Sequence, residues 1–263
     1  VLINGKRLGI TTSGYQDLSA VPMGMVERID VLKDGASAMY GSDAMAGVVN
    51  IITRKNFEGL EFTVYGGEYD EGDGEKKNVS MVTGITGDRG SITLGAEWRD
   101  EGDVWAKDRE FSEVSYPGYD IPNNRTLVGQ YGRFNYNDQW YVAKRPGNAA
   151  SFDDFEPQTY ENGSSISQQQ MHLETPLSAR SLYVSANYAL TDDINFSSDI
   201  GYSERKATRQ VAGYPYQSAS DDIVLSADSY FNPVDEDVYF TRRGWEVPRT
   251  TESNQDTLRF TAA

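Results

Sequence analysis

Polar and apolar residues alternate along several separate segments of the chain, starting at Leu60. In the first segment Leu60, Phe62 and Val64 are apolar, whereas Glu61 and Thr63 are polar. The same period recurs in residues 78–86, 91–100, 181–190, 194–204 and 256–262. Successive side chains of a strand point to opposite faces, so this period indicates five strands and the beginning of a sixth. A sheet with one apolar and one polar face is typical of either a soluble sandwich or a transmembrane barrel.

The connections between these strands differ in length in a regular order. Two are short, Gly87–Gly90 and Thr191–Asp193, and they alternate with three long ones at residues 68–77, 101–179 and 206–255. Transmembrane barrels have short turns on one side and long loops on the other, whereas a sandwich has no reason to sort its connections. Aromatic residues at strand ends suit an interfacial girdle: Trp98, Tyr188 and Tyr202. The pattern therefore favours an antiparallel transmembrane β-barrel.

The first 55 residues follow a different pattern. The turn signal Asn4-Gly5 follows a short strand, and Val48–Thr53 is a continuous, mostly β-branched run that predicts a buried strand. Between them we expect a short helix at Val21–Val26, a strand at Glu27–Leu32 and a helical turn at Ala36–Tyr40 closed by Gly41. This part of the chain predicts a small α/β unit with close packing around glycines.

The stretch VERIDVLKDGASAMYGSDAMAGVVNIITR, residues 26–54, resembles the end of the plug domain of TonB-dependent outer-membrane receptors. The corresponding pieces are the strand Val26–Leu32, the small-residue segment Ala36–Ala38, the pair Tyr40-Gly41, the turn Ala44–Gly47 and the run Val48–Thr53. Asp34-Gly35 stands where the family often has Gly-Pro. Residues 227–243 are also similar to an extracellular-loop segment of one branch of that family.

The resemblance implies a barrel of about 22 strands with a plugged lumen, of which roughly a quarter is present. We expect the C-terminal part of the plug at residues 1–56 and the first barrel strands with their loops at residues 57–263. It also implies active import of a scarce ligand across the outer membrane of a Gram-negative bacterium, with the ligand bound by loops and plug. The energising partner is then the TonB–ExbB–ExbD complex, acting through a segment before residue 1, and no covalent chemistry or cofactor is needed. Both chain ends read as internal to the fold.

The plug-like segment contains residues that suit a movable element. Glycine permits left-handed turns and close backbone approach, and this is the role expected for Gly35, Gly41 and Gly47. Tyr40 and Asn50 belong to the same motif. We expect the charged residues of the segment to pair with acids of the barrel wall: Arg28, Asp30, Lys33, Arg54 and Lys55 with Glu61, Glu97 or Asp199. The alternative is that they are ordinary solvated charges.

The long connections are rich in aromatic and polar residues. Tyrosine and tryptophan stack on sugar faces or flat ligands, while arginine forms hydrogen bonds with them. The candidate ligand-binding residues are Tyr116, Tyr119, Arg125, Tyr131, Trp140, Tyr141, Tyr214 and Tyr216. They favour a carbohydrate or oligosaccharide, or an iron–siderophore, as ligand. The alternative is packing and hairpin structure within the loops.

Composition argues against several kinds of partner and site. The 263 residues carry a net charge of −16, which argues against nucleic acid as a partner, and there is no cysteine to form a disulfide. His172 is the only histidine, so a zinc or copper site is not expected. The acidic segments Tyr69–Glu75 and Asn232–Tyr239 suit solvated loop tips better than calcium sites.

Two other functional classes stay open from the sequence. One is a soluble β-sandwich that acts as a binding module or adhesin. The other is a β-rich glycosidase, with Asp153, Asp154 and Glu156 as its paired carboxylates. The position of the apolar strand faces separates the first from a barrel, because a sandwich buries them against a second sheet.

Overall fold

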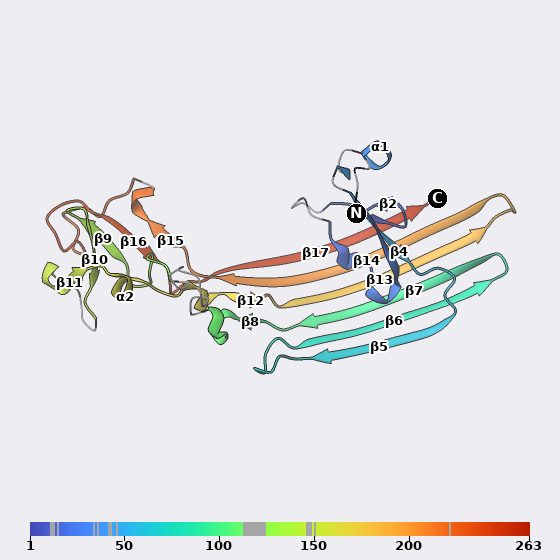
Figure 1. Cartoon of the computed structure of the whole chain (residues 1–263), viewed down its shortest axis with the longest axis horizontal. Coiled ribbons are helices and arrows are strands. Elements are labelled where there is room, and N and C mark those ends of the chain that lie inside the picture. Colours follow the sequence, from blue (N-terminus) through green and yellow to red (C-terminus); the bar gives the residue numbers. More distant parts are fainter. Residues whose placement is uncertain are drawn as a thin grey trace. The chain divides into compact units, whose positions relative to one another are not determined.

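The computed structural model describes the chain except residues 11–13, 15, 34, 36, 42–43, 46, 113–124, 146–148, 150 and 221. The side chains of residues 19, 38, 39 and 160 are also left undescribed. The chain forms two compact units (Figure 1). The sheet unit comprises Val1–Gly102, Pro176–Ala207 and Glu252–Ala263, and the loop unit comprises Asp103–Thr175 and Thr208–Thr251.

The sheet unit is built on six long strands. They are β5 (Gly59–Gly67), β6 (Lys76–Gly87), β7 (Gly90–Glu101), β13 (Leu177–Ala189), β14 (Asn195–Val211) and β17 (Arg249–Ala262), in the spatial order β17-β14-β13-β7-β6-β5. The pairs from β5 to β14 are antiparallel. Beside β14, Ser197 and Ala263 exchange both backbone hydrogen bonds, at 2.8 and 2.9 Å. The predicted strands and both short turns are thereby confirmed.

The sheet buries its polar face and exposes its apolar face. On β7, Thr93 is 1% exposed whereas its neighbour Ile92 is 57% exposed. On β13 and β14, Ser185 and Ser203 are each 2% exposed, whereas Ile200 is 45% exposed. This is the reverse of a water-soluble sheet, in which the apolar face is covered.

The exposed face forms a continuous apolar band. Cross-strand rows such as Ile85–Ile92 and Leu94–Val184–Ile200 place apolar side chains directly opposite one another. Charges appear on this face only from the row of Arg180 and Glu204 toward the long-loop end of the strands. The uncharged stretch from Leu182 to Leu190 covers about 27 Å of extended chain, comparable with the apolar band of about 25 Å around transmembrane barrels.

The N-terminal part of the sheet unit, here called the plug segment, has a smaller sheet. Its strands are β1 (Leu2–Ile3), β2 (Lys6–Arg7), β3 (Val26–Leu32) and β4 (Val48–Thr53), in the order β2-β1-β4-β3. Only β1 and β4 run parallel. The described residues of this segment also form the short turns η1 (Leu18–Ala20), η2 (Met23–Met25) and α1 (Ser37–Tyr40). The strands predicted at residues 27–32 and 48–53 are confirmed. The helix predicted at Val21–Val26 is only the single 3₁₀ turn η2, because the extended Pro22 (ψ 137°) and Val26 (ψ 120°) bound it.

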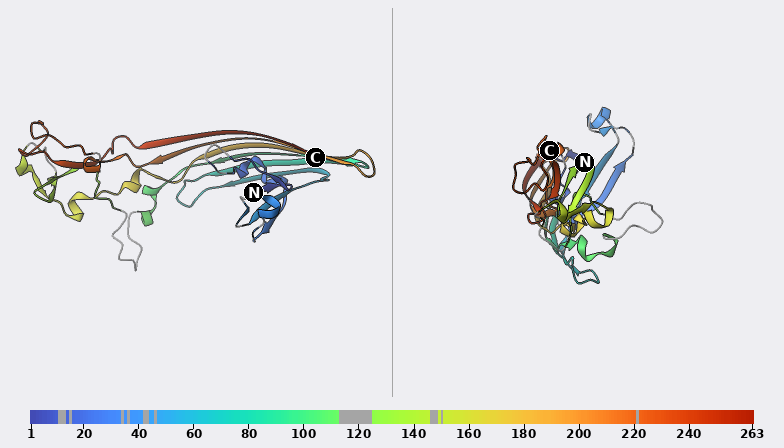
Figure 2. Two further views of the ribbon diagram at one scale, coloured as in Figure 1. Left: turned by 90° about the horizontal axis from the view of Figure 1, so that it is seen from above. Right: turned by 90° about the vertical axis from the view of Figure 1, so that its left-hand side faces the viewer.

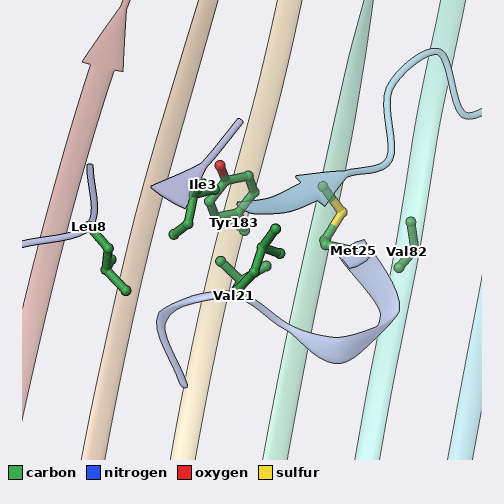
Figure 3. Close-up of a cluster of buried hydrophobic side chains, with 7 residues drawn as sticks. Ile3, Leu8, Val21, Met25, Val82 and Tyr183 are labelled. Carbon is green, nitrogen blue, oxygen red and sulfur yellow. The ribbon is translucent and has the colours of Figure 1, made fainter. Parts of the chain in front are cut away.

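The plug segment packs on the polar face of the six-stranded sheet (Figure 2). The contact is a small apolar cluster of Ile3, Leu8, Val21, Met25 and Ile51 from the plug segment with Val82 and Tyr183 from the sheet (Figure 3). Met25 is fully buried and lies against Gly95, where a Cβ would come within 2.1 Å of the Met25 Cγ. A glycine on the wall therefore makes room for the largest plug side chain in the cluster.

The loop unit has its own five-stranded sheet in the order β11-β10-β9-β16-β15. The long connection before β13 supplies β9 (Arg133–Tyr136), β10 (Gln139–Ala143) and β11 (Phe155–Pro157), and the connection before β17 supplies β15 (Pro215–Gln217) and β16 (Tyr239–Arg243). The remaining elements are β8 (Val104–Trp105), η4 (Ala106–Asp108), η5 (Glu110–Ser112), η6 (Phe152–Asp154), α2 (Tyr160–Gly163), η7 (Ser167–Gln170), β12 (His172–Glu174) and η8 (Ser218–Ser220). Within the described ranges, no helix has the length and apolar character needed to cross a membrane.

The first prediction concerns the contact between Gly95 and Met25, which holds the plug segment on the sheet. In Gly95→Ala the new Cβ overlaps Met25, and overpacking of this kind costs about 1–3 kcal/mol. We expect faster protease cleavage within residues 1–55 of the full-length protein. The control is Gly66→Ala, whose Cβ meets no described atom within 4 Å. Equal cleavage rates in the two variants would show that the plug segment does not depend on this contact.

Candidate functional site

A buried carboxylate anchors the plug segment to the sheet. Asp199 on β14 is 4% exposed. Its Oδ1 accepts hydrogen bonds from Asn4 Nδ2 (3.3 Å) and Ser185 Oγ (2.9 Å), and its Oδ2 accepts from Thr261 Oγ1 (3.3 Å). Asn4 also bonds the side chain of Thr53, at 2.8 Å, so β4 of the plug segment is joined to the same group. The carboxylate of Asp199 thus connects the strands β13, β14 and β17 of the sheet with the β1–β2 turn of the plug segment and, through Asn4, with β4.

Two further acids of the wall contact the plug segment. Glu97 Oε2 accepts the backbone N–H of Met23 at 2.7 Å, and Asn78 Nδ2 donates to the other oxygen of the same carboxylate. Arg54 Nη1 lies 2.8 Å from Glu61 Oε2. The predicted pairing is therefore present for Arg54. Arg28 pairs instead with Glu27 and Asp30 beside it, each at 3.2 Å, because all three project from the exposed β3.

The other residues of the plug motif have local roles in the described geometry. Asn50 Oδ1 accepts the N–H of Gly5 at 2.9 Å and so closes the β1–β2 turn. Gly47 has φ +142°, and a Cβ there would lie 2.4 Å from the Leu32 carbonyl oxygen. Gly41 has φ +87° and follows α1, whose last residue Tyr40 is 37% exposed. A Cβ on Gly35 would stand 3.4 Å from the Met45 carbonyl oxygen.

A pocket of about 420 Å³ lies where η2 meets the polar face of β5, β6 and β7. The strand register explains its lining, because Tyr65, Asn78 and Arg99 form one cross-strand row on this face. The next row toward the long loops holds Lys76 and Glu101. Met23 and Gly24 close the pocket on the plug side.

The pocket combines groups that bind polar ligands. Tyr65 is 57% exposed and offers a ring and a hydroxyl. The guanidinium of Arg99 offers hydrogen-bond donors. Its Nε lies 3.7 Å from Glu101 Oε1, so a carboxylate acceptor stands beside these donors. Asn78 joins the pocket to the plug segment, since it shares Glu97 with the N–H of Met23. Sequence reasoning missed this site, although the alternation assigns all three row members to the polar face.

Within the loop unit, the predicted ligand-binding residues lie in different surroundings. Tyr214 and Tyr216 lie beside each other, with ring centroids 5.1 Å apart and about half of each side chain exposed. Arg145 covers the ring of Tyr131 at 3.9 Å, and Arg125 reaches Ser164. Tyr116 and Tyr119 lie outside the described residues.

Two neighbours on β10 face in different directions. Tyr141 packs into the core of the loop unit, 5.8 Å from the ring of Phe134 and 5.0 Å from that of Phe152. Trp140 holds the guanidinium of Arg133 over its ring at 4.1 Å. Burial lowers the pKa of Arg133, yet an arginine stays charged at any physiological pH.

The other groups singled out in the sequence make local contacts within the loop unit. His172 is buried beside Trp105, accepts the N–H of Gln210 at 3.2 Å and lies 4.0 Å from Asp103. The side chain of Asp154 caps the N–H of Ser151, and Glu156 accepts from Asn162. Over the part of the chain that the structure describes, no three acidic or histidine side chains are grouped to hold a metal ion.

The comparisons with known proteins agree with the geometry. Residues 1–48 match the family model of the TonB-dependent receptor plug domain. The chain is also 38% identical over 147 residues to the vitamin B12 transporter BtuB of Photobacterium profundum. That match covers 54% of this chain and 22% of the relative, so the chain spans only a part of the relative's length. The resemblance inferred from residues 26–54 is thereby confirmed.

A second prediction concerns the contribution of Asp199 to the stability of the full-length protein against urea. In Asp199→Ala three donors lose this acceptor, and the buried hydroxyl of Ser185, left unsatisfied, alone costs about 1–3 kcal/mol. We expect a lower urea midpoint for the full-length protein in detergent micelles. Asp256→Ala, at an exposed position of β17, is the control. If both variants unfold at the same urea concentration, Asp199 is not an anchor.

A third prediction concerns the core of the loop unit. Phe134 is 5% exposed and packs with Val234 and Val238, so it joins the two long connections. Phe134→Ala is expected to cost about 3–5 kcal/mol of loop-unit stability. Hydrogen exchange is then expected to quicken in β9, β10 and β16 but not in β6 and β7. Tyr230→Ala, at a side chain that is 94% exposed, serves as the control and leaves exchange unchanged. Unaltered exchange in Phe134→Ala would contradict a shared core.

Proposed function

Taking as premise that the chain carries the plug domain of a TonB-dependent receptor, we propose that it imports a scarce ligand across the bacterial outer membrane. The observation that carries this proposal is the inverted sheet, which exposes its apolar face and covers its polar face with the plug segment. In this proposal the wall strands lie in the outer membrane and the plug fills the lumen. The TonB–ExbB–ExbD complex supplies the energy from the periplasmic side. The boundary between plug and barrel domains is placed at residues 56 and 57.

The alternatives fit the inverted sheet less well. A soluble sandwich or adhesin would cover the apolar face with a second sheet, but among the described residues the small plug sheet lies on the polar face. A barrel in lipid leaves that apolar face outside and satisfies its backbone groups by strand pairing. A glycosidase needs two carboxyl groups facing one substrate, whereas Asp154 accepts the N–H of Ser151 and Glu156 accepts from the side chain of Asn162. The proposed role is transport without covalent chemistry.

The pocket beside η2 suggests how ligand binding reaches the plug. A ligand that bonds Asn78 competes with Glu97 for the same amide. Glu97 also holds the N–H of Met23, so a change at Asn78 alters the plug contact next to it. Met23 lies two residues before Met25, whose side chain sits against Gly95. We assign to this short path the transfer of the ligand signal from the wall to the plug.

The ligand is proposed to be a small polar molecule that binds in the pocket beside η2. Tyr65, Asn78 and Arg99 offer stacking and hydrogen bonds of the kind that carbohydrates and siderophores accept. The name of the relative adds vitamin B12 as a third candidate. These three ligand classes differ in charge and size, so one uptake experiment separates them.

The uptake experiment uses a deletion strain and the same strain complemented with the full-length gene. Growth is compared on candidate oligosaccharides, under iron limitation with ferric siderophores, and with vitamin B12 as the limiting nutrient. We expect one condition to require both the gene and an intact TonB system. Uptake that persists without TonB would overturn the proposed energy source, and wild-type growth of the deletion strain in all three conditions would overturn import of these ligand classes.

Variants of the pocket test the proposed site. Arg99→Gln and Tyr65→Ala each remove a group that lines the pocket, so the Kd for the transported ligand is expected to rise roughly tenfold. The matched controls are Arg180→Gln and Tyr202→Ala, which lie on the outward face of the same sheet. Binding to the purified full-length protein is measured by titration calorimetry. Equal Kd values in all four variants would move the ligand site elsewhere.

A further inference from the structure

A second hollow, of about 650 Å³, lies on the outward apolar face of the sheet. Its walls come from four neighbouring strands, β6, β7, β13 and β14. Large apolar and aromatic side chains contribute to the lining: Ile85, Ile92, Leu94, Tyr188 and Phe196. The hollow is distinct from the ligand pocket, which lies on the opposite face.

Missing side chains create this hollow. Gly87, Gly90 and Ala186 lie among the larger residues of the lining, so the surface is lower there. At Gly90 a Cβ would lie 2.3 Å from the Asn187 carbonyl oxygen and 3.0 Å from the Tyr188 ring, so only glycine leaves that ring its place. The result is an apolar depression of the kind that a hydrocarbon chain can fill.

The hollow ends at the short turns of the sheet, where Arg89 stands. The side chain of Arg89 is exposed; it donates to the carbonyl oxygens of Ala189 (3.1 Å) and Leu190 (2.5 Å), and it lies 5.6 Å from the Tyr188 ring. These contacts fix the guanidinium at the rim of the hollow. They use Nε and Nη2, and in the described structure Nη1 donates to no residue. A guanidinium held in this way is suited to a phosphate group.

Three acidic residues lie in the two short turns at the same end of the sheet as this arginine. Asp88 precedes Arg89 in the β6–β7 turn, and Asp192 and Asp193 lie in the neighbouring β13–β14 turn. All three are exposed. They repel a lipid with net negative charge, but they attract an ammonium group that lies next to the phosphate. The charges at the rim therefore match a zwitterion.

We propose that this hollow binds a phospholipid with a zwitterionic aminoethyl headgroup, a phosphatidylethanolamine. One acyl chain lies along Ile85, Ile92 and Phe196, the phosphate meets Arg89, and the ammonium meets the turn carboxylates. The proposal rests on the proposed function, because it needs the outward face to lie in a membrane. Short turns mark the periplasmic side of an outer-membrane barrel, so the lipid belongs to the inner leaflet.

Native mass spectrometry of the full-length protein tests the site. The protein is released from bilayer nanodiscs that contain equal amounts of phosphatidylethanolamine, phosphatidylglycerol and phosphatidylcholine of the same chain length. We expect one phosphatidylethanolamine to stay bound preferentially. Arg89→Gln removes the phosphate donor, and Ala186→Leu fills the hollow while leaving Arg89 in place. Each is expected to reduce the retained fraction roughly tenfold.

Matched controls separate this site from general lipid adhesion. Arg180→Gln removes an outward arginine at the other end of the strands, and Ala96→Leu enlarges an outward alanine beyond the hollow. Both controls are expected to retain lipid as the unchanged protein does. Equal retention in all four variants, or retention of all three lipids alike, would overturn the site. Failure of the protein to enter bilayers at all would instead overturn the proposed function.

Discussion

The rest of the structure depends on one inversion: the six-stranded sheet turns its polar side chains inward and its apolar side chains outward. In water this arrangement is unfavourable, because apolar area stays exposed on one face. In hydrocarbon it is favourable, since the backbone groups are paired between strands and only apolar side chains meet the lipid. The plug segment follows from the same inversion. A polar inner face needs hydrogen-bonding partners, and Asn4 and the N–H of Met23 supply them to Asp199 and Glu97.

Much of this architecture could be predicted from the sequence because its signals are local. Period-two alternation located all six strands, and the motif in residues 26–54 identified the plug. The pairing of Arg54 with Glu61 was also foreseeable, as only seven positions separate the two. Arg28 did not behave as expected because nearby acids on its own strand satisfy it. The pocket at Tyr65, Asn78 and Arg99 needed the strand register, which alternation alone does not supply.

The loop unit shows the limit of local signals. Asn137 and Asp138 both have positive φ and form the tight β9–β10 turn, a hairpin signal present in the sequence. The pairing of β9 with β16, however, joins segments about a hundred residues apart, and no local pattern announces it. In the folded loop unit Tyr141 packs against the Phe134 core, whereas Tyr214 and Tyr216 are exposed at the surface. Aromatic content alone could not distinguish packing residues from available ones.

The contacts that hold the plug segment on the sheet differ in their response to salt. At Asp199 and Glu97 the plug partners are neutral donors, an amide side chain and a backbone N–H, whereas Arg54 forms an ion pair with Glu61 of the wall. Dissolved salt screens pairs of opposite charges, but it weakens hydrogen bonds from uncharged donors less. The hydrogen bonds of the plug segment with Asp199 and Glu97 are therefore expected to persist at ionic strengths that weaken the Arg54–Glu61 pair.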